Sequence, residues 1–203
     1  MLFLRYLQQA DQAVRNGGTS AGLCGREIRS KKVGIIGCGQ IGFMTAKLFQ
    51  AFGAEVYAYA RHEREEVKAA GIAYKPLDDL LRECDIISLH TPNNKETRGM
   101  ISAEKIALMK KSAIFINCAR GPIVDSKALA QALNEGRIAG AAVDVFDCEP
   151  PIPAEEPLLH AKNTLLTPHV AFLSEEAMVR RAKIEFSNVC AYLDGKPENV
   201  CAL

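Results

Sequence analysis

Several charged or titratable side chains stand just after apolar runs of the sequence. Arg120 follows AIFINC, Asp144 stands near the end of AGAAVDV, Glu149 lies in the proline-rich loop beyond it, and His169 follows NTLLTP. Taken alone, each has a simple structural explanation, such as an exposed turn arginine or a surface glutamate. In combination they fit the reduction of a 2-oxo acid. A guanidinium pairs with a carboxylate, and an imidazole whose pKa is raised by a neighbouring carboxylate transfers a proton.

A glycine-rich turn forms a second candidate site. In VGIIGCGQIG, Gly37, Gly39 and Gly42 make the pattern G-x-G-x-x-G between a β-branched run and an apolar helical pattern. Gly37 permits the turn, Gly39 lets a pyrophosphate approach the backbone, and Gly42 allows the helix and the strand to pack closely. The pattern requires a second strand about twenty residues further on, which EVYAYA supplies. It predicts a dinucleotide-binding turn, and the alternative is a glycine-rich turn in another doubly wound protein.

Alternating strands and helices are expected to position both candidate sites. Strands are predicted at 33–36, 55–60, 72–74, 86–90, 113–118, 139–145 and 163–169. Helices are predicted over 43–52 and 61–71, after Pro76, from Ser102 to Met109, and from Asp125 or Ser126 through Leu133. Because the strands are continuously apolar, the pattern indicates an α/β fold, namely a Rossmann-type doubly wound parallel sheet of about seven strands flanked by helices. The carboxyl ends of the strands form the ligand-binding edge of such a sheet.

An amphipathic helix is predicted near each end of the chain. Residues 2–16 carry apolar side chains at helical spacing and end at two glycines, and Ser174 caps a long helix that reaches about Leu193. The expected organisation is a connecting helix over 1–17, a dinucleotide-binding domain over 18–173, and a connecting helix with a tail over 174–203.

The composition gives no indication of a nucleic-acid or membrane partner. The 203 residues are 48% hydrophobic and 24% charged with a formal net charge of +1, so electrostatic attraction to a polyanion is not expected. No signal peptide or membrane span is indicated, since no apolar run is long enough. The seven cysteines are never spaced as C-x-x-C. They favour reduced thiols in the cytoplasm over disulfides or a metal site.

Four longer motifs carry a resemblance to a known family. They are SLHTPNNKETRGMI at 88–101, INCARGPIVDSKAL at 116–129, AAVDVFDCEPP at 141–151 and LLTPHVAFLSEEA at 165–177. In this order they resemble the D-isomer-specific 2-hydroxyacid dehydrogenases over nearly the whole chain. The resemblance implies hydride transfer between NAD(P)(H) and a small 2-oxo or 2-hydroxy acid. It also implies a homodimer, because the family commonly dimerises through its nucleotide-binding domains.

The resemblance further implies roles for individual residues. Arg120 would bind the substrate carboxylate, His169 would transfer the proton at the 2-oxo oxygen, and Glu149 would hydrogen-bond the imidazole. Asp144 would hold the nicotinamide carboxamide. The other expected cofactor contacts are Gly37, Gly39, Gln40, Ile41, Gly42, Arg61, His90, Thr91, Pro92, Cys118 and Ala119.

Two departures from the family pattern leave alternatives open. Many NAD-linked relatives carry Asp at the end of the second strand, where this chain has Ala60 followed by Arg61. Loss of that carboxylate removes a repulsion of the 2′-phosphate, and Arg61 can pair with the phosphate, so NADP(H) is favoured over NAD(H). The other interpretation is that Arg61 is a solvated residue at a helix start. The family's separate substrate-binding domain is also largely absent, so the alternative function is a dinucleotide-binding or nucleotide-sensing module without turnover.

Overall fold

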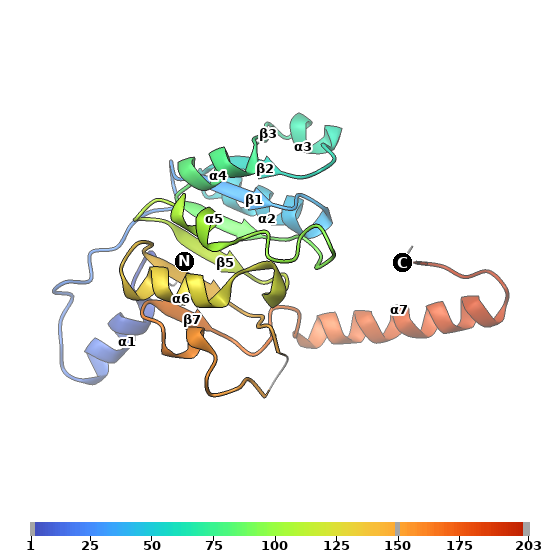
Figure 1. Ribbon diagram of the computed structural model, residues 1–203. Helices are drawn as coiled ribbons and strands as arrows, with labels where there is room; N and C mark the ends of the chain where they lie inside the picture. The colour runs from blue at the N-terminus through green and yellow to red at the C-terminus, as the bar shows by residue number, and fades with distance from the viewer. Residues whose placement is uncertain (1–2, 149–150, 201–203) are drawn as a thin grey trace. The chain divides into compact units, whose positions relative to one another are not determined.

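The computed structural model describes residues 3–148 and 151–200. The chain divides into two compact units, one ending at Pro168 and the other beginning at His169. Among the described residues, the first unit holds the sheet and six α-helices, and the second holds one long helix (Figure 1). The helices of the first unit are α1 Leu7–Arg15, α2 Gln40–Ala51, α3 Glu65–Ala69, α4 Leu77–Glu83, α5 Ala103–Ala107 and α6 Ser126–Asn134, with the 3-10 turns η1 Gly121–Ile123 and η2 Pro157–His160.

Seven strands form the sheet of the first unit, and every neighbouring pair is parallel. Their order is β3-β2-β1-β4-β5-β6-β7, so the direction of winding reverses between β1 and β4. The predicted Rossmann-type sheet is therefore confirmed. The seventh strand differs most in length from its prediction, since it has only three residues where 163–169 was expected. The strands are β1 Lys32–Ile36, β2 Glu55–Tyr59, β3 Ala73–Tyr74, β4 Ile86–Leu89, β5 Ile114–Asn117, β6 Gly140–Val143 and β7 Thr164–Leu166.

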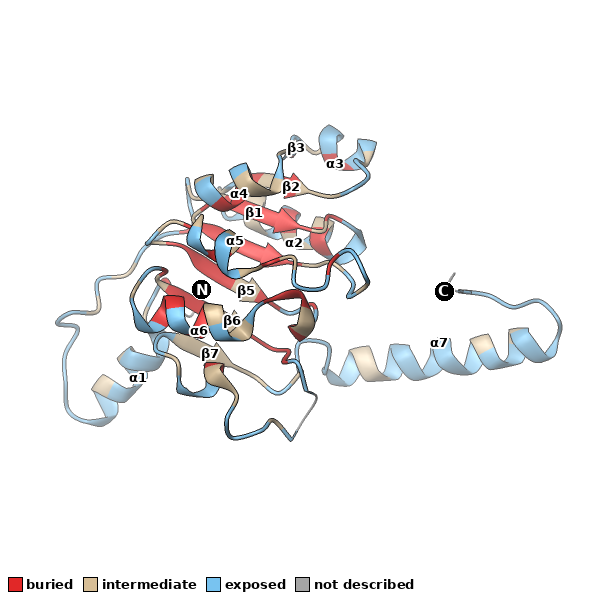
Figure 2. Ribbon diagram, in the orientation of Figure 1, coloured by how far each residue is buried: buried red, intermediate tan, exposed pale blue. Residues whose placement is uncertain are grey.

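Successive residues of β1 enter different cores on the two faces of the sheet. Ile36 packs in the core that includes Leu80 of α4 and Ile106 of α5. Ile35 packs in the core that includes Ala46 of α2. The central strands are buried along most of their length (Figure 2). Burial on both faces is the physical reason why the strands have continuously apolar sequences.

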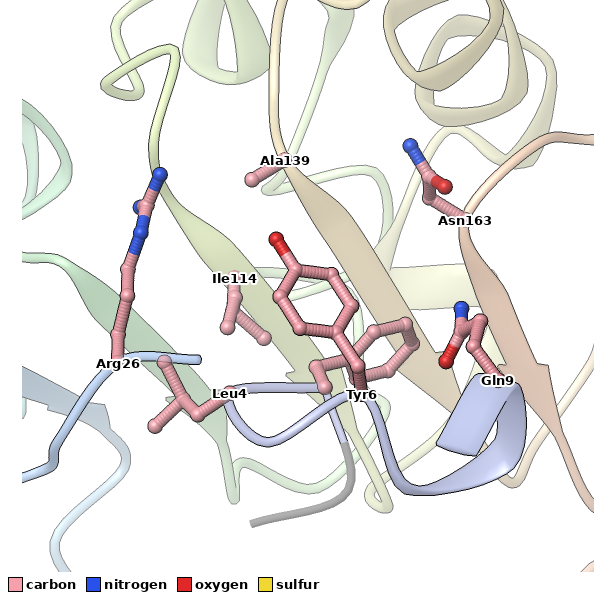
Figure 3. Close-up of a pocket in the computed structure, with 8 residues that line it drawn as sticks. Leu4, Tyr6, Gln9, Arg26, Ile114, Ala139 and Asn163 are labelled. Atoms are coloured by element: carbon pink, nitrogen blue, oxygen red, sulfur yellow. The ribbon is translucent and has the colours of Figure 1, made fainter. Parts of the chain in front are cut away.

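The first helix begins later than predicted, at Leu7 instead of residue 2. Leu4 is buried with the core beside α2, and its carbonyl accepts a hydrogen bond from the backbone N–H of Arg26 at 2.7 Å, so it makes no helical bond. Tyr6 then turns the chain with a left-handed backbone, φ 50°. This segment crosses the amino ends of β5 to β7 beside a hollow of about 230 Å³ (Figure 3). The hollow is lined by Phe3, Leu4, Tyr6, Gln9, Arg26, Ile114, Ala139 and Asn163.

The charged helix predicted over 61–71 is also shorter, since α3 begins at Glu65. Arg64 is extended and its backbone N–H donates to the hydroxyl of Tyr74 at 3.1 Å, which keeps the preceding residues out of the helix. At α6 the cap is Asp125, whose carboxylate accepts from the backbone N–H of Ala128 at 2.9 Å. The sequence alone allows either Asp125 or Ser126 as the N-cap of this helix, and the structure assigns Asp125.

The second unit contains helix α7, Glu175–Leu193, in agreement with the predicted helix. Ser174 caps it by accepting from the backbone N–H of Ala177 at 3.2 Å. The structure describes α7 over its whole length, and none of its residues is buried. Within the described ranges, no helix of the protein is both long and apolar enough to cross a membrane.

Candidate cofactor and active site

The carboxyl ends of β1 and β4 meet where the strand order reverses. Gly37 follows β1 with φ +90°, and a Cβ at this position would lie 2.7 Å from the carbonyl carbon of His90. The backbone N–H of His90 donates to the carbonyl of Ile36 at 2.7 Å, which fixes the end of β4 against β1. Glycine is required at position 37 by both its backbone angle and this close approach. Reversal points of this kind are where doubly wound sheets bind ligands.

The glycine turn is closed on one side and open on the other. A Cβ at Gly42 would collide with the carbonyl oxygen of Gly37, so α2 packs directly against the turn. Gly39 caps α2, and a Cβ there would meet no atom of the described residues within 4 Å. The backbone N–H groups at the start of this 12-residue helix therefore border open space. This arrangement suits a pyrophosphate, which the helix N-terminus attracts.

A groove of about 530 Å³, the first groove, lies at the carboxyl edge of β4 and β5. It is formed by the loops that follow these strands together with one residue of α2. The residues that line it are Ile41, His90, Thr91, Pro92, Asn93, Cys118, Ala119 and Arg120. Seven of these eight are among the residues predicted to contact cofactor or substrate, so the fold brings them together from three separate segments.

Arg120 is held in this groove by the buried side chain of Asn117. Asn117 ends β5 and is only 2% exposed; its amide donates to the carbonyl of Arg120 at 3.1 Å and accepts from the N–H of Ala119 at 3.0 Å. The Arg120 guanidinium donates to the carbonyl of Ala119 at 2.6 Å. A guanidinium has more donors than this one bond uses, so Arg120 can also bind a carboxylate.

A second groove of about 350 Å³ adjoins the first, because His90, Thr91 and Pro92 line both. It extends from the glycine turn to the residues that follow β2. Arg61 lines this groove, and its guanidinium forms an ion pair with Glu96 from the loop after β4. The remaining lining residues are Gly37, Cys38, Gly39, Tyr59, Ala60, His62, Arg64, Asn94, Thr97 and Met100.

The hydroxyl of Thr91 lies in the wall shared by both grooves. Its oxygen is buried and has no hydrogen-bond partner in the part of the chain that the structure describes. Buried hydroxyl groups are normally hydrogen-bonded, so this one indicates a polar ligand atom in the grooves. Together with the open side of the turn at Gly39, it fits a dinucleotide lying along both grooves.

His90 is an uncharged part of the same shared wall at neutral pH. Its Nε2 is hydrogen-bonded to the hydroxyl of the buried Ser88, with the two atoms 2.9 Å apart. Burial lowers the pKa of His90 below its ordinary value, because a low-dielectric environment disfavours the imidazolium. His90 therefore adds no positive charge to the shared wall at neutral pH.

Asp144 is 3% exposed and is not one of the residues that line either groove. The hydroxyl of Thr167 donates to its carboxylate, and its backbone N–H donates to the carbonyl of Asn117 at 2.9 Å. Its charge nevertheless acts on the first groove. Desolvation and, secondarily, the Asp144 carboxylate raise the pKa of the Cys118 thiol, which is therefore protonated at neutral pH.

Several predicted cofactor contacts, Gly42 and Asp144 among them, are not among the described residues that line either groove. Gln40 begins α2 and is exposed, but it lines neither groove. Glu149 lies outside the described residues. His169 begins the second unit with a left-handed backbone, φ 57°, and its ring packs edge-on against Phe172 with the centroids 5.4 Å apart. The two grooves are thus made by the first unit alone.

Residues 1–171 match the family model of the D-isomer specific 2-hydroxyacid dehydrogenase, NAD binding domain. The chain belongs to the D-isomer-specific 2-hydroxyacid dehydrogenase family. The resemblance seen in the sequence motifs is thereby confirmed.

Among relatives of this dehydrogenase domain, the glyoxylate reductase of Aeropyrum pernix is 42% identical over 189 residues, which are 92% of this chain and 56% of the relative. A solved acyclic imino acid reductase in complex with NADPH and D-Arg superimposes with a TM-score of 0.89 at 32% identity, over 99% of this chain and 64% of its own. The D-lactate dehydrogenase from Aquifex aeolicus, complexed with NAD and lactic acid, gives 0.90 at 32% identity, over 96% and 63%. The chain therefore spans little more than half of the Aeropyrum relative.

Sequence patterns missed several residues that shape the grooves, and two of them, Asn117 and Glu96, show why. Asn117 carried a usable signal, since a polar residue at the end of a buried strand needs hydrogen-bond partners. Glu96 carried none, because it lies 35 positions from Arg61 and only the fold brings the two together.

Proposed function

We propose that the protein is an oxidoreductase that transfers a hydride between NAD(P)(H) and a small 2-oxo acid, forming a D-2-hydroxy acid. The observation that carries the proposal is the position of Arg120 in a groove that adjoins the open glycine turn. A cation for a carboxylate beside a dinucleotide site is what reduction of a 2-oxo acid requires. The names of the relatives, a glyoxylate reductase and a D-lactate dehydrogenase among them, support this substrate class.

The residues of the two grooves would bind the cofactor. The turn at Gly37 and Gly39, with the first residues of α2, would hold the pyrophosphate through backbone N–H groups. The Thr91 hydroxyl would hydrogen-bond a polar atom of the cofactor. Asp144, which lines neither groove in this structure, would accept from the nicotinamide carboxamide once the cofactor is bound. When bound, the reduced nicotinamide supplies a hydride to the 2-oxo carbon.

The protein's own groups would bind the substrate and move the proton. Arg120 would hold the substrate carboxylate with its planar pair of donors and polarise the neighbouring carbonyl, which a lysine would do less well. His169, as imidazolium, would donate a proton to the 2-oxo oxygen, and the neutral ring would take it back in the oxidation direction. Glu149 would hydrogen-bond the other ring nitrogen and so favour the charged imidazole.

NADP(H) is the cofactor that we propose as preferred, with NAD(H) also used. Position 60 is alanine where a carboxylate would repel a 2′-phosphate, and Arg61 lines the second groove. Relatives with either cofactor are known in this family, since one solved structure holds NADPH and another NAD. Dissociation constants for NADPH and NADH test this preference, and NADH binding at least tenfold tighter would contradict it.

A cytoplasmic homodimer completes the proposal. The cysteines lack C-x-x-C spacing, which favours a reducing compartment. Apolar side chains exposed on α7, among them Val179, Ile184 and Phe186, provide a surface that an oligomer would cover. A monomer in light scattering at micromolar concentration would contradict the dimer.

Steady-state reduction of glyoxylate and of hydroxypyruvate by the full chain tests the activity. We expect turnover, and we expect His169→Ala to lower kcat by roughly 10²- to 10⁴-fold. His160→Ala, on η2, is the matched control and should leave kcat unchanged, because that imidazole lines neither groove and is hydrogen-bonded to the loop carbonyl of Ala154 at 2.7 Å. Cofactor binding without turnover of either acid would contradict the dehydrogenase activity and support a dinucleotide-binding module.

A further inference from the structure

Glu96 has a position in the second groove that the proposed mechanism does not use. It is the one acidic residue among the described residues that line this groove. Its carboxylate forms the ion pair with Arg61, although the two side chains remain 63% and 58% exposed. The groove therefore contains a carboxylate after all, supplied by the loop after β4 instead of by the end of β2.

The loop that carries Glu96 is fixed by its own hydrogen bonds. The side-chain oxygen of Asn94 accepts from the backbone N–H groups of Glu96 and Thr97, both at 3.0 Å. The Thr97 hydroxyl donates to the carbonyl of Pro92 at 2.6 Å and accepts from the N–H of Asn94 at 2.9 Å. The backbone at Glu96 is thus held in place, which keeps its side chain within reach of Arg61.

We propose that Glu96 is a specificity-determining residue that sets the balance between NADP(H) and NAD(H). A 2′-phosphate that pairs with Arg61 must first displace the Glu96 carboxylate from the guanidinium. The phosphate and the carboxylate then both lie in the second groove, where their negative charges repel each other. A ribose 2′-hydroxyl meets neither obstacle. Glu96 thus limits the preference for NADP(H) that Arg61 creates, and this inference rests on the cofactor proposed above.

A second ion pair at the same groove provides a matched control. Arg64 also lines the second groove and pairs with Glu66, but Glu66 itself does not line it. Glu66→Gln removes the same charge from the same region and releases an arginine, without removing a carboxylate from the groove. If Glu96 acts through its position, only Glu96→Gln will change the selectivity.

Calorimetric titration of the full chain with 2′,5′-ADP and with 5′-AMP tests the inference, because these fragments differ only in the 2′-phosphate. We expect Glu96→Gln to bind 2′,5′-ADP roughly tenfold more tightly than the natural chain, with 5′-AMP unchanged within about twofold. Glu66→Gln should change neither ligand, and Arg61→Ala combined with Glu96→Gln should lose the gain.

Two results would overturn the role of Glu96. One is an unchanged ratio of the two affinities in Glu96→Gln, and the other is an equal gain in Glu66→Gln, which would assign the effect to net charge. The cofactor proposal fails separately, if the natural chain binds NADH at least tenfold more tightly than NADPH. Glu96→Gln would in that case still shift the ratio if the inference is correct.

Discussion

The two grooves share one wall but hold their arginines by different means. In the first groove, Arg120 stands on a turn fixed by the buried amide of Asn117, and its guanidinium donates to the adjacent carbonyl of Ala119. In the second groove, Arg61 is held by an ion pair with Glu96 whose two partners are mostly exposed. A buried, satisfied amide fixes a backbone strongly, whereas exposed ion pairs contribute little to stability. The first groove is therefore built to hold one geometry, and the second is open to adjustment.

Exchanging each arginine for lysine tests this comparison with the largest expected effect. Arg120→Lys keeps the charge but loses the planar pair of donors, so kcat/KM for glyoxylate should fall by about 10²- to 10³-fold. Arg61→Lys should raise the KM for NADPH by only about three- to tenfold and leave kcat unchanged, because a phosphate accepts a point charge almost as well. Steady-state kinetics with each variant supplies both numbers. Equal losses in the two variants would break the distinction between the grooves.

Substitutions within the glycine turn sharpen the comparison with a smaller effect. Gly42→Ala places a Cβ against the carbonyl of Gly37 and should lower the free energy of unfolding by about 1–3 kcal/mol. Gly39→Ala meets open space, so the stability should be unchanged while the dissociation constants of NADH and NADPH both rise roughly tenfold. Urea unfolding and cofactor titration measure the two effects. A Gly39→Ala variant that binds both cofactors as tightly as the natural chain would contradict the proposed pyrophosphate contact at this turn.

The sheet was predictable because each strand carries its own evidence. A run such as that of β4 is buried on both faces, and burial on both faces is what a continuously apolar sequence records. The start of α1 was predicted wrongly for a related reason. Leu4 has the spacing of a helical residue, yet it packs with the core beside α2 and its carbonyl bonds Arg26, which is remote in sequence. Local periodicity contains no information about such a partner.

The site divides in the same way. Residues that follow a strand directly, such as Thr91 and Arg120, are carried to the ligand edge by the topology, so their grouping in one groove could be predicted. The pairing of Arg61 with Glu96 could not, because it depends on the path of an exposed loop between two strands. The residues that form the first groove could thus be predicted from the sequence, whereas the pairing of charges in the second groove could not.

The smallest expected effect concerns the wall that the grooves share. Burial lowers the pKa of His90, so the unfolded chain binds a proton more readily than the native chain does. The free energy of unfolding should therefore decrease as the pH falls below about 6.5, by at most about 1.4 kcal/mol per pH unit from this group. Above that pH the contribution is fully present, and it is lost as the pH falls toward the lower pKa of the native state.

Urea unfolding between pH 7.5 and 5.5 measures this loss. The carboxylates that titrate in the same pH range contribute equally to the natural chain and to His90→Asn, so the difference between their two free-energy profiles reports His90 alone. The same protonation would add a positive charge between Arg120 and Arg61. Identical slopes for the natural chain and His90→Asn would contradict the burial of His90 as a neutral imidazole.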